Sequence, residues 1–303
     1  MVKSQYLLST LFSSSFMNRI IDNDHSSYLE HIISATNFYA KTKTKLSLQD
    51  LLCEAYGVLE NSYRCEYIFK NVVLNELLLK KHTLKNTTYL TEVRTFTSKA
   101  DIVMLNGTSS VYEIKSDHDN FNRLLNQVTN YCKVFDHVSV VSNTSNEKKL
   151  KAILPKKIGV ITLLDNQKLS IARESVSNIR KLDKSMMFDT LRKPEYLKII
   201  SDVYGEVPNL PNTKINGKCR ELFCKLTNTD AHLHFLSTLK ERRMAQNQIN
   251  LITRAKPPLK GILSDKHYSN VECNLINLAL HQNITNSVLS VHQSKSMGLS
   301  SNC

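Results

Sequence analysis

The sequence predicts an α/β fold in which helices cover both faces of a mixed β-sheet. Three observations predict it. Three strand-like segments follow one another closely, at 89–96, 101–105 and 111–116. An amphipathic helix comes next, and the chain then alternates between strand-like and helical segments. A start rich in hairpins that leads into such alternation is typical of a mixed sheet flanked by helices. Additional, mostly helical regions are expected toward both ends of the chain.

The segments before the sheet are expected to be helical. A weakly patterned region contains a candidate helix over Ser26–Ala40. Ser47 and Asp50 have the spacing of a capping box, which predicts that a helix begins there and runs to Leu59. The stretch Ser62–His82 carries a wide apolar face, so we expect a longer buried helix over it.

The three strands are predicted from composition and from a turn. Residues 89–96 are rich in β-branched and aromatic side chains, which favours a strand. Asn106 and Gly107 tolerate the positive φ angles that a tight hairpin turn requires. The strands over 101–105 and 111–116 are therefore expected to form a hairpin.

Residues 121–135 are predicted to form an amphipathic helix. Its apolar residues recur at helical spacing and form one stripe: Phe121, Leu124, Leu125, Val128, Cys132 and Phe135. A second line of residues, four apart, runs along the flank: Arg123, Gln127 and Tyr131. A strand over 137–142, a basic helix over 147–154 and a strand over 157–164 complete the predicted core.

Beyond residue 174 the pattern is one of helices and loops. Helices are expected over Leu191–Tyr204, beginning near Pro194, and over Asp230–Arg243, with Thr229 as the N-cap. Two prolines and a glycine predict a loop over 205–212. The chain is accordingly divided into an N-terminal helical extension (1–46), the sheet-containing domain (47–172), a mostly helical domain (173–260) and a polar, partly flexible segment (261–303).

The strongest compositional feature is a net charge of +13, with an isoelectric point near 9.3. A basic chain attracts polyanions, chiefly nucleic acid or an anionic membrane surface. The sequence has neither a long basic amphipathic helix nor an apolar run of membrane-spanning length, so nucleic acid is the favoured partner and a membrane is not. Lysines that only keep the protein soluble would give the same composition.

Chemistry-bearing residues converge around the predicted hairpin. Glu113 and Lys115 alternate with Tyr112 and Ile114, so the two charged side chains share one face of their strand. Asp101 opens the preceding strand. If its side chain lies across the hairpin near the face of Glu113 and Lys115, two carboxylates and an ammonium group come together. Buried charges need partners or a metal, and a divalent cation would meet that need. An exposed salt-bridge cluster is the alternative for the same residues.

The spacing of these residues resembles the PD-(D/E)XK nuclease superfamily. The Asp lies twelve residues before the Glu, and a Gln-x-x-x-Tyr pair begins twelve residues after the Lys, as in the RecB-like and phage-exonuclease branch. Ala100 stands where the name-giving proline would be, and that proline performs no chemistry. The run from Arg64 to Phe135 is also similar to a bacterial family of uncharacterised proteins assigned to the superfamily. This similarity rests on Glu66-Tyr67, Leu90–Glu92, Lys99–Asp101, Tyr112–Ser116 and Gln127–Phe135.

The resemblance implies a restriction-endonuclease-like domain over about 47–172 and Mg²⁺-dependent hydrolysis of phosphodiester bonds, with DNA as the expected substrate. Mn²⁺ can substitute for Mg²⁺. The implied metal ligands are Asp101, Glu113, the main-chain carbonyl of Ile114 and Glu66. Lys115 would orient the attacking water or neutralise the developing charge. The side chains implied to contact the substrate or brace the ligands are Gln127, Tyr131 and Arg123.

Simpler alternatives stay open for several of these residues. A glutamate such as Glu66 is favourable at a helix start on dipole grounds alone, and Glu76 and Glu92 are rivals for its place in the metal shell. Tyr131 could be a half-buried aromatic on a helix flank. For the whole protein, the rivals are a non-catalytic nucleic-acid-binding or regulatory protein and a protein-interaction role of the C-terminal half. A homo-oligomer or protein partner is compatible with the sequence.

Other candidate sites are weaker. Seven scattered cysteines without a CxxC pair favour the reducing cytoplasm, and Cys132 is expected to be buried. Asp230, His232 and His234 are expected on the surface, because alternate residues of a helix do not face one way. Two basic clusters could follow a phosphate backbone or simply be solvated helix faces: Lys148, Lys149, Lys151, Lys156 and Lys157, then Lys240, Arg242, Arg243, Arg254 and Lys256.

Overall fold

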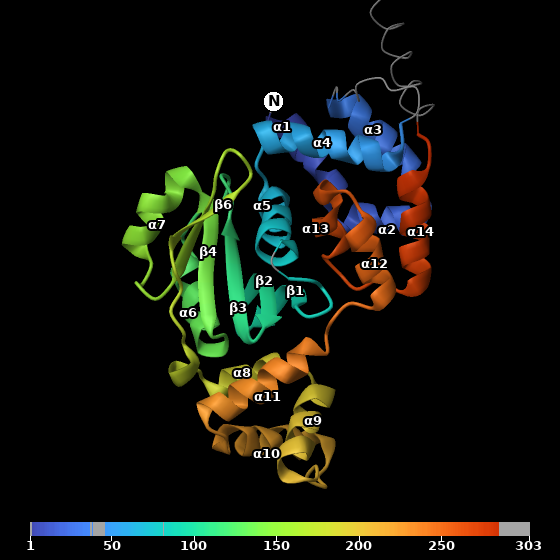
Figure 1. The fold of residues 1–303 in the computed structure, drawn as a ribbon. Coiled ribbons are helices and arrows are strands. Elements are labelled where there is room, and N and C mark those ends of the chain that lie inside the picture. The colour runs from blue at the N-terminus through green and yellow to red at the C-terminus, as the bar shows by residue number, and fades with distance from the viewer. Residues whose placement is uncertain (1, 37, 39–45, 81, 285–303) are drawn as a thin grey trace, which may run out of the picture. The chain divides into compact units, whose positions relative to one another are not determined.

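A computed structural model describes residues 2–36, 38, 46–80 and 82–284, and these residues form two compact units (Figure 1). The first unit contains the described residues up to Asn75 together with those from Met244 onward, and the second is Glu76–Arg243. The units therefore change at 75/76 and 243/244, whereas the predicted regions change at 46/47, 172/173 and 260/261. The difference arises because helices near the two ends of the chain pack together.

The first unit is helical. Its α-helices are α1 (Val2–Ser9), α2 (Ser14–Ile21), α3 (Ser26–Thr36), α4 (Leu48–Ser62), α5 (Glu66–Val73), α12 (Gln246–Arg254), α13 (Lys260–Leu263) and α14 (Asn270–His281), with short 3₁₀ turns at Thr10–Phe12 and Pro257–Leu259. The last helix, α14, packs against α2 and α4, and α13 packs against α5 (Figure 1). Segments from opposite ends of the sequence thus share one core.

Two helix predictions in this unit are confirmed and one is wrong at its start. The capping box is present: the Asp50 N–H donates to Ser47 Oγ (3.2 Å), and the Ser47 N–H donates to the Asp50 carboxylate (3.3 Å). α3 begins at Ser26, and its predicted end at residue 40 lies outside the described residues. The helix predicted from Ser62 begins instead at Glu66, because Tyr63 ends α4 and Cys65 is extended. It continues as a π-helix, η2 (Leu74–Leu79).

The second unit contains a six-stranded mixed sheet, which confirms the predicted fold class. The strands are β1 (Thr88–Thr95), β2 (Ser98–Asn106), β3 (Thr108–Lys115), β4 (His137–Asn143), β5 (Gly159–Leu163) and β6 (Leu169–Arg173), and they lie in sequence order. β3, β4 and β5 are parallel, and the other neighbours are antiparallel. The helices α6 (Leu124–Val134) and α7 (Glu147–Ile153) make the two parallel connections. The strand β6 was not predicted.

The predicted hairpin between β2 and β3 is confirmed. Asn106 pairs with Thr108 across Gly107, whose φ of +71° lies in the region that glycine adopts at little cost. Asn106 itself keeps a strand conformation, so the turn relies on glycine alone.

One face of the sheet is closed by α6. The shared core includes Val103, Val111 and Val140 from the strands and Leu124, Val128 and Phe135 from α6 or its end. Burying each such side chain contributes about 1.5–3 kcal/mol. The helix begins at Leu124 rather than at Phe121, and Leu125 of the predicted stripe is 48% exposed.

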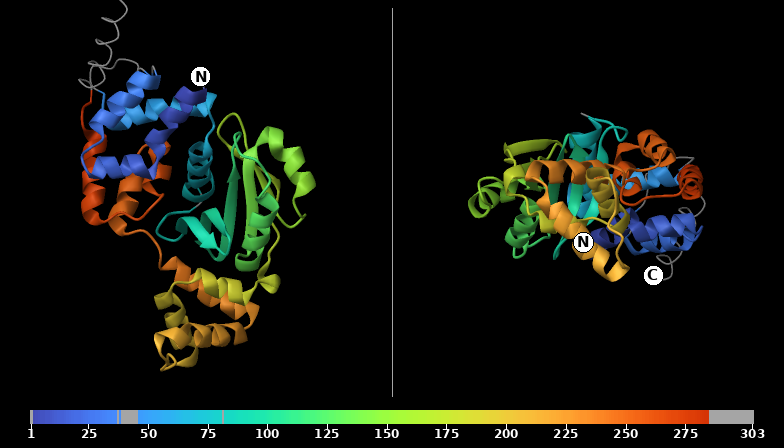
Figure 2. Two further views of the ribbon diagram at one scale, coloured as in Figure 1. Left: turned by 180° about the vertical axis from the view of Figure 1, so that it is seen from behind. Right: turned by 90° about the horizontal axis from the view of Figure 1, so that it is seen from below.

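Four further helices lie together beyond one end of the sheet (Figures 1 and 2). They are α8 (Lys184–Thr190), α9 (Lys193–Tyr204), α10 (Asn212–Lys225) and α11 (Asn228–Lys240), with a 3₁₀ turn at Ile179–Lys181 before them and another at Thr144–Asn146 before α7. The predicted loop after Tyr204 is confirmed. The N-cap of α11 is Thr227, not Thr229, because Thr227 Oγ1 accepts the N–H of Asp230 (3.1 Å).

This helical group sits at the N-terminal ends of β1 and β3. Thr88 Oγ1 donates to the carbonyl of Lys240 (3.1 Å), and Ser109 Oγ lies 2.9 Å from His232 Nε2. Glu113 and Lys115 stand four and six residues further along β3, which is roughly 13–20 Å away. Among the described residues, no helix is both long enough and apolar enough to cross a membrane.

Candidate active site

The candidate site begins where β2 and β3 separate. Their paired register ends at Ile102 and Tyr112. The next pair in that register would be Asp101 and Glu113, and residues directly opposite one another share a face of the sheet. Beyond the last pair, the Asp101 carboxylate takes the place of a backbone partner and accepts the N–H of Ile114 (2.7 Å). Asp101 is therefore fixed between the two strands.

Glu113 is the centre of a buried hydrogen-bonded network. Only 1% of Glu113 is exposed, and its Oε1 accepts from Lys115 Nζ (2.7 Å) and from Gln127 Nε2 (2.6 Å). Its Oε2 accepts from the hydroxyl of Tyr131 (2.8 Å), whose oxygen also lies 2.9 Å from the carbonyl oxygen of Lys99. The structure thus brings together four of the predicted site residues, and the flank of α6 supplies two of them.

Burial controls the electrostatics of this network. It raises the pKa of the Glu113 carboxyl, and the neighbouring Lys115 ammonium opposes that rise. Burial also raises the pKa of Tyr131, and the charge of Glu113 raises it further. Because Glu113 and Lys115 are both buried, they are not the exposed salt-bridge cluster of the alternative interpretation. Tyr131 is fully buried rather than half-buried.

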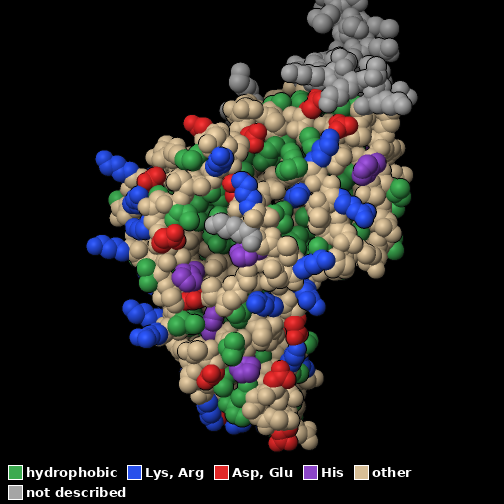
Figure 3. Space-filling view, in the orientation of Figure 1, with side chains coloured by type: hydrophobic (Ala, Val, Ile, Leu, Met, Phe, Trp, Pro, Cys, Tyr) green, Lys and Arg blue, Asp and Glu red, His purple; other side chains and the backbone are tan. Residues whose placement is uncertain are grey.

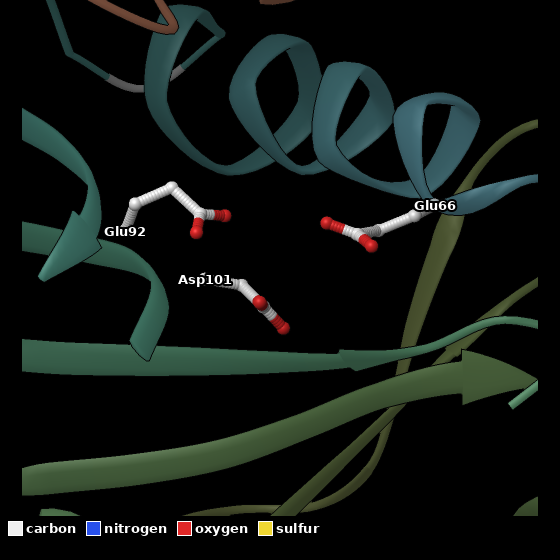
Figure 4. Close-up of side chains that lie close together, drawn as sticks. All are labelled: Glu66, Glu92 and Asp101. Carbon is white, nitrogen blue, oxygen red and sulfur yellow. The ribbon is translucent and has the colours of Figure 1, made fainter. Parts of the chain in front are cut away.

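Glu92 of β1 joins Asp101. In the β1–β2 register Glu92 stands opposite Asp101, between the pairs made by Thr91 and Val93. A carboxylate oxygen of Glu92 lies within 4.8 Å of one of Asp101, and Figure 4 shows the two side chains. Glu92 also forms an ion pair with Lys99. The sequence raised Glu92 only as a rival ligand, and the register identifies it as a direct neighbour of Asp101.

The backbone of Glu92 is strained. Its φ is +57°, a left-handed conformation that non-glycine residues seldom adopt inside a strand. Such a conformation costs on the order of 1–3 kcal/mol and persists where the surrounding structure imposes it. Strained residues of this kind cluster at functional sites. The positive φ therefore makes Glu92 a stronger candidate for the site than the sequence alone would.

Two further side chains were predicted for the site, Glu66 and Arg123. Glu66, also labelled in Figure 4, is exposed in the first turn of α5, in the first unit, and pairs with Lys70 (2.6 Å); its metal role stays a prediction. Arg123 is exposed immediately before α6. The N–H and C=O of an extended residue face the same neighbouring strand, so the carbonyl of Ile114 faces β2 as its N–H does.

The oxygen atoms around Asp101 fit a hard divalent cation. Carboxylates and backbone carbonyls are the donors that Mg²⁺ prefers, and Asp101, Glu92 and Ile114 offer both kinds. Protein groups engage all three carboxylates: Asp101 accepts the Ile114 N–H, Glu92 pairs with Lys99, and both oxygens of Glu113 accept hydrogen bonds. Asp101 and Glu92 suit a cation by their geometry, because their carboxylate oxygens lie within 4.8 Å of each other, and Glu113 stands opposite Asp101 on the next strand.

Comparison with known proteins gives the chain a family. A family model described as Bacteriophage P4 protein cII matches residues 59–257. The chain belongs to this family. Protein cII of Enterobacteria phage P4 is 28% identical over 139 residues, which cover 44% of this chain and 52% of that protein. The chain thus spans about half the length of this curated relative.

A solved structure gives a weaker likeness. SPO1766, a protein of unknown function from Silicibacter pomeroyi, is 14% identical over 47% of this chain and 94% of its own, with a TM-score of 0.31. A likeness at that level carries no argument. All the predicted site residues lie in the region that matches the cII family, whose description names a phage protein and no activity.

This cII-family chain contains a second buried polar cluster, at the opposite end of the sheet. Ser109 Oγ lies 2.9 Å from His232 Nε2 and accepts the N–H of Asp136 (3.0 Å). Both Ser109 and His232 are buried, so the expected surface position of His232 is wrong, and no substrate reaches this serine. Burial lowers the pKa of His232, while Asp136 opposes that effect. The cluster serves packing rather than nucleophilic chemistry.

Both basic clusters contain exposed side chains and paired ones. Lys148, Lys149 and Lys151 are exposed on α7, and Lys156 is exposed just beyond it. Figure 3 shows Lys and Arg side chains protruding at the margin where α7 lies. In the second cluster, Arg242 donates to Glu195 (2.7 and 2.6 Å) and Lys256 donates to Asp50 (2.5 Å). In the α7 cluster Lys151 likewise pairs with Glu147 (2.7 Å), so each cluster keeps exposed basic side chains that could contact a phosphate backbone.

Proposed function

We propose that this protein is a metal-dependent nuclease of the PD-(D/E)XK superfamily that hydrolyses phosphodiester bonds in DNA. One observation carries the proposal: the buried Glu113–Lys115 pair on β3, 2.7 Å apart, next to the point where Asp101 separates two strands. Burying a carboxylate and an ammonium group is costly, and a chemical role explains why the chain keeps both.

Asp101, Glu92, Glu113 and the carbonyl of Ile114 are the groups that would hold Mg²⁺ or Mn²⁺. When bound, such a cation lowers the pKa of a coordinated water and neutralises charge on the scissile phosphate. The resemblance also implies Glu66 as a ligand, and substitution of Glu66 can test this.

The chain's own residues position the chemistry. Gln127 and Tyr131 hold Glu113 in one orientation through hydrogen bonds of 2.6 and 2.8 Å. Lys115 lies beside the same carboxylate, where its ammonium group can orient the attacking water or stabilise the charge that develops on the phosphate. Since Tyr131 and Gln127 share one flank of α6, the helix fixes both braces together.

The second candidate function is a nucleic-acid-binding protein that does not cleave. A specific observation favours it: every oxygen of the Glu113 carboxylate is satisfied by Lys115, Gln127 and Tyr131. Such a network is electrostatically complete without a cation. The basic residues of α7 would then bind a phosphate backbone.

A cleavage assay separates the two functions. Labelled linear duplex, single-stranded and flapped DNA are incubated with Mg²⁺, Mn²⁺ or EDTA. The nuclease proposal expects products with either metal and none with EDTA. Binding to every substrate without any product would support the non-catalytic function and contradict the nuclease.

Substitution of Glu92 tests the ligand set. Glu92→Gln is expected to raise the Mg²⁺ concentration for half-maximal cleavage at least about tenfold, because a neutral amide binds the cation more weakly than a carboxylate. Glu66→Gln and Glu76→Gln are compared in the same titration because both are candidates for the metal shell, and Glu206→Gln, at an exposed position in the loop after α9, is the matched control. An unchanged Mg²⁺ requirement for Glu92→Gln would remove Glu92 from the ligand set.

A further inference from the structure

The β1–β2 hairpin ends in an exposed, strained aromatic residue. Thr95 pairs with Ser98, so Phe96 and Thr97 form a two-residue turn. Phe96 is 67% exposed and has a φ of +54°. Turns of this kind normally place Gly, Asn or Asp at positive φ, and a bulky residue there is an outlier. The phenyl ring of Phe96 is thus exposed to solvent, and its backbone has a φ that is sterically unfavourable for a bulky residue.

The same hairpin carries a second unfavourable feature. Arg94 and Lys99 are direct partners in the β1–β2 register, and both are exposed. Side chains that stand directly opposite share a face, and like charges in such a pair repel. Glu92 compensates part of this repulsion through its ion pair with Lys99. A phosphate group would compensate it more fully.

The tip is held firmly by α6. Asn130, which is buried, donates to Ser98 Oγ (2.9 Å) and to Thr97 Oγ1 (3.2 Å). The hydroxyl oxygen of the next residue, Tyr131, lies within hydrogen-bonding distance of both the Lys99 carbonyl (2.9 Å) and the Glu113 carboxylate (2.8 Å). The exposed ring of Phe96 therefore projects from a turn that is anchored to the same helix as the candidate site.

The distance from the tip to the site is short on the scale of a nucleic acid. Phe96 follows Glu92 by four residues, which corresponds to roughly 13 Å along a strand. Stacked nucleotides rise about 3.4 Å each, so this length spans roughly four nucleotides. One strand of nucleic acid can contact the tip and the carboxylates at once.

We propose that the tip of the β1–β2 hairpin binds single-stranded nucleic acid. Phe96 stacks on an unpaired base, and Arg94 and Lys99 contact the phosphates between that base and the site. The position of the cleaved bond relative to the stacked base rests on the proposed nuclease function, whereas the binding itself does not. The substrate class of the site is therefore a strand with an unpaired segment, such as a free end or a flap.

Binding of the full chain in EDTA tests this without any cleavage. Fluorescence anisotropy measures the Kd for a labelled oligodeoxythymidine of about 16 nucleotides and for a blunt duplex of the same length. Stacking of one base on an aromatic ring contributes to the binding free energy. We therefore expect the Phe96→Ala substitution to raise the Kd for the single strand about tenfold. On the duplex the change is expected to stay below about twofold.

Two controls accompany this variant. Phe96→Tyr keeps an aromatic ring and is expected to bind the single strand as the unaltered protein does. Leu233→Ala removes another exposed apolar side chain (60% exposed) from α11, at the other end of the sheet, and is expected to change neither Kd.

Arg94→Ala and Lys99→Ala are each expected to reduce the slope of log Kd against log salt by about 0.7 on the single strand.

The outcomes separate this inference from the nuclease proposal. Equal single-strand Kd values for Phe96→Ala and the unaltered protein would overturn it, as would equal losses on single strand and duplex or no single-strand binding at all. A Phe96-dependent single-strand Kd with no cleavage in Mg²⁺ would support the inference and contradict the nuclease. Cleavage by a protein whose single-strand Kd does not depend on Phe96 would support the nuclease and contradict the binding role of the hairpin tip.

The strain at the tip gives an independent readout. Phe96→Asn is expected to weaken single-strand binding as Phe96→Ala does, yet to raise the folding equilibrium constant about fivefold, because asparagine tolerates positive φ. Urea unfolding of the full chain measures this. A variant that binds less and is also less stable would indicate a purely structural role for Phe96.

Discussion

Cleavage by the Glu113→Gln variant is expected to be at least about a thousandfold slower, which corresponds to about 4 kcal/mol of lost transition-state stabilisation. A neutral amide neither holds a divalent cation as a carboxylate does nor balances the charge of Lys115, which lies 2.7 Å away. The measurement is the single-turnover rate on the best substrate at saturating Mg²⁺. A rate within about tenfold of the unaltered protein would remove Glu113 from the chemistry.

The loss must be distinguished from unfolding, since Glu113→Gln leaves Lys115 buried without its partner. Breaking such a pair costs about 3–5 kcal/mol because the remaining charge is buried without a partner, and removing both charges avoids that cost. The double variant Glu113→Gln/Lys115→Met is therefore expected to recover stability but not cleavage. Glu206→Gln, at an exposed position in the loop after α9, is the matched control and should retain both. Recovery of cleavage in the double variant would contradict the assigned roles.

Replacing Asp136 with Ala is expected to lower the free energy of unfolding of the second unit by about 3 kcal/mol. Asp136 is 5% exposed and lies between α6 and β4. Its carboxylate accepts from Thr108 Oγ1 (2.6 Å), from the Asn178 N–H (3.0 Å), from the Ile179 N–H (3.2 Å) and from the hydroxyl of Ser177. The alanine variant leaves these donors without their acceptor, and the Asn178 N–H, which is buried, accounts for the largest part of the cost.

The effect of Asp136 is expected to depend on pH with a definite sign. Burial alone would raise the pKa of this carboxyl, but hydrogen bonds from Ser177 and Thr108 outweigh burial and lower it from its ordinary value of 3.8. A carboxyl with a lowered folded-state pKa contributes stability above about pH 4, and this contribution is lost as the pH falls through the folded-state value. The gap between the unaltered protein and Asp136→Ala in urea unfolding should thus narrow below pH 4.

Asp202→Ala is the control for Asp136, because Asp202 is exposed on α9. Its unfolding free energy should match that of the unaltered protein within about 0.5 kcal/mol. A gap for Asp136→Ala that stays constant from neutral to acidic pH would show that the carboxylate charge is not what the network requires.

Much of the sheet could be predicted because its signals are local. Residues 89–116 combine β-branched residues, alternation and a glycine turn, so β1, β2 and β3 were placed within three residues at each end. The helix α10 was missed because its buried stripe is only Ile215, Cys219 and Phe223, four residues apart, in an otherwise polar segment. The strand β6 was missed for a similar reason: its five residues are at most half-buried, so no apolar run marks it.

The sequence predicted which types of residue form the site, but not which residues of neighbouring strands lie opposite one another. Glu113, Lys115, Gln127 and Tyr131 follow a spacing that strand and helix periods bring together. Glu92 could be found only from the β1–β2 register and from a positive φ, and both depend on how two strands align. Propensity does not encode that alignment, since a shift by one residue would have turned Glu92 to the other face.

The division of the first unit between the two ends of the chain has a consequence for how the protein is made. Every pair of neighbouring strands in the second unit is also adjacent in sequence, so the sheet can complete itself as soon as residues up to Arg173 have left the ribosome. The helices α2 and α4 are synthesised well before their packing partner α14. During that interval the apolar side chains that α14 covers are exposed, and we expect the nascent chain to be most prone to aggregation and to need chaperones then.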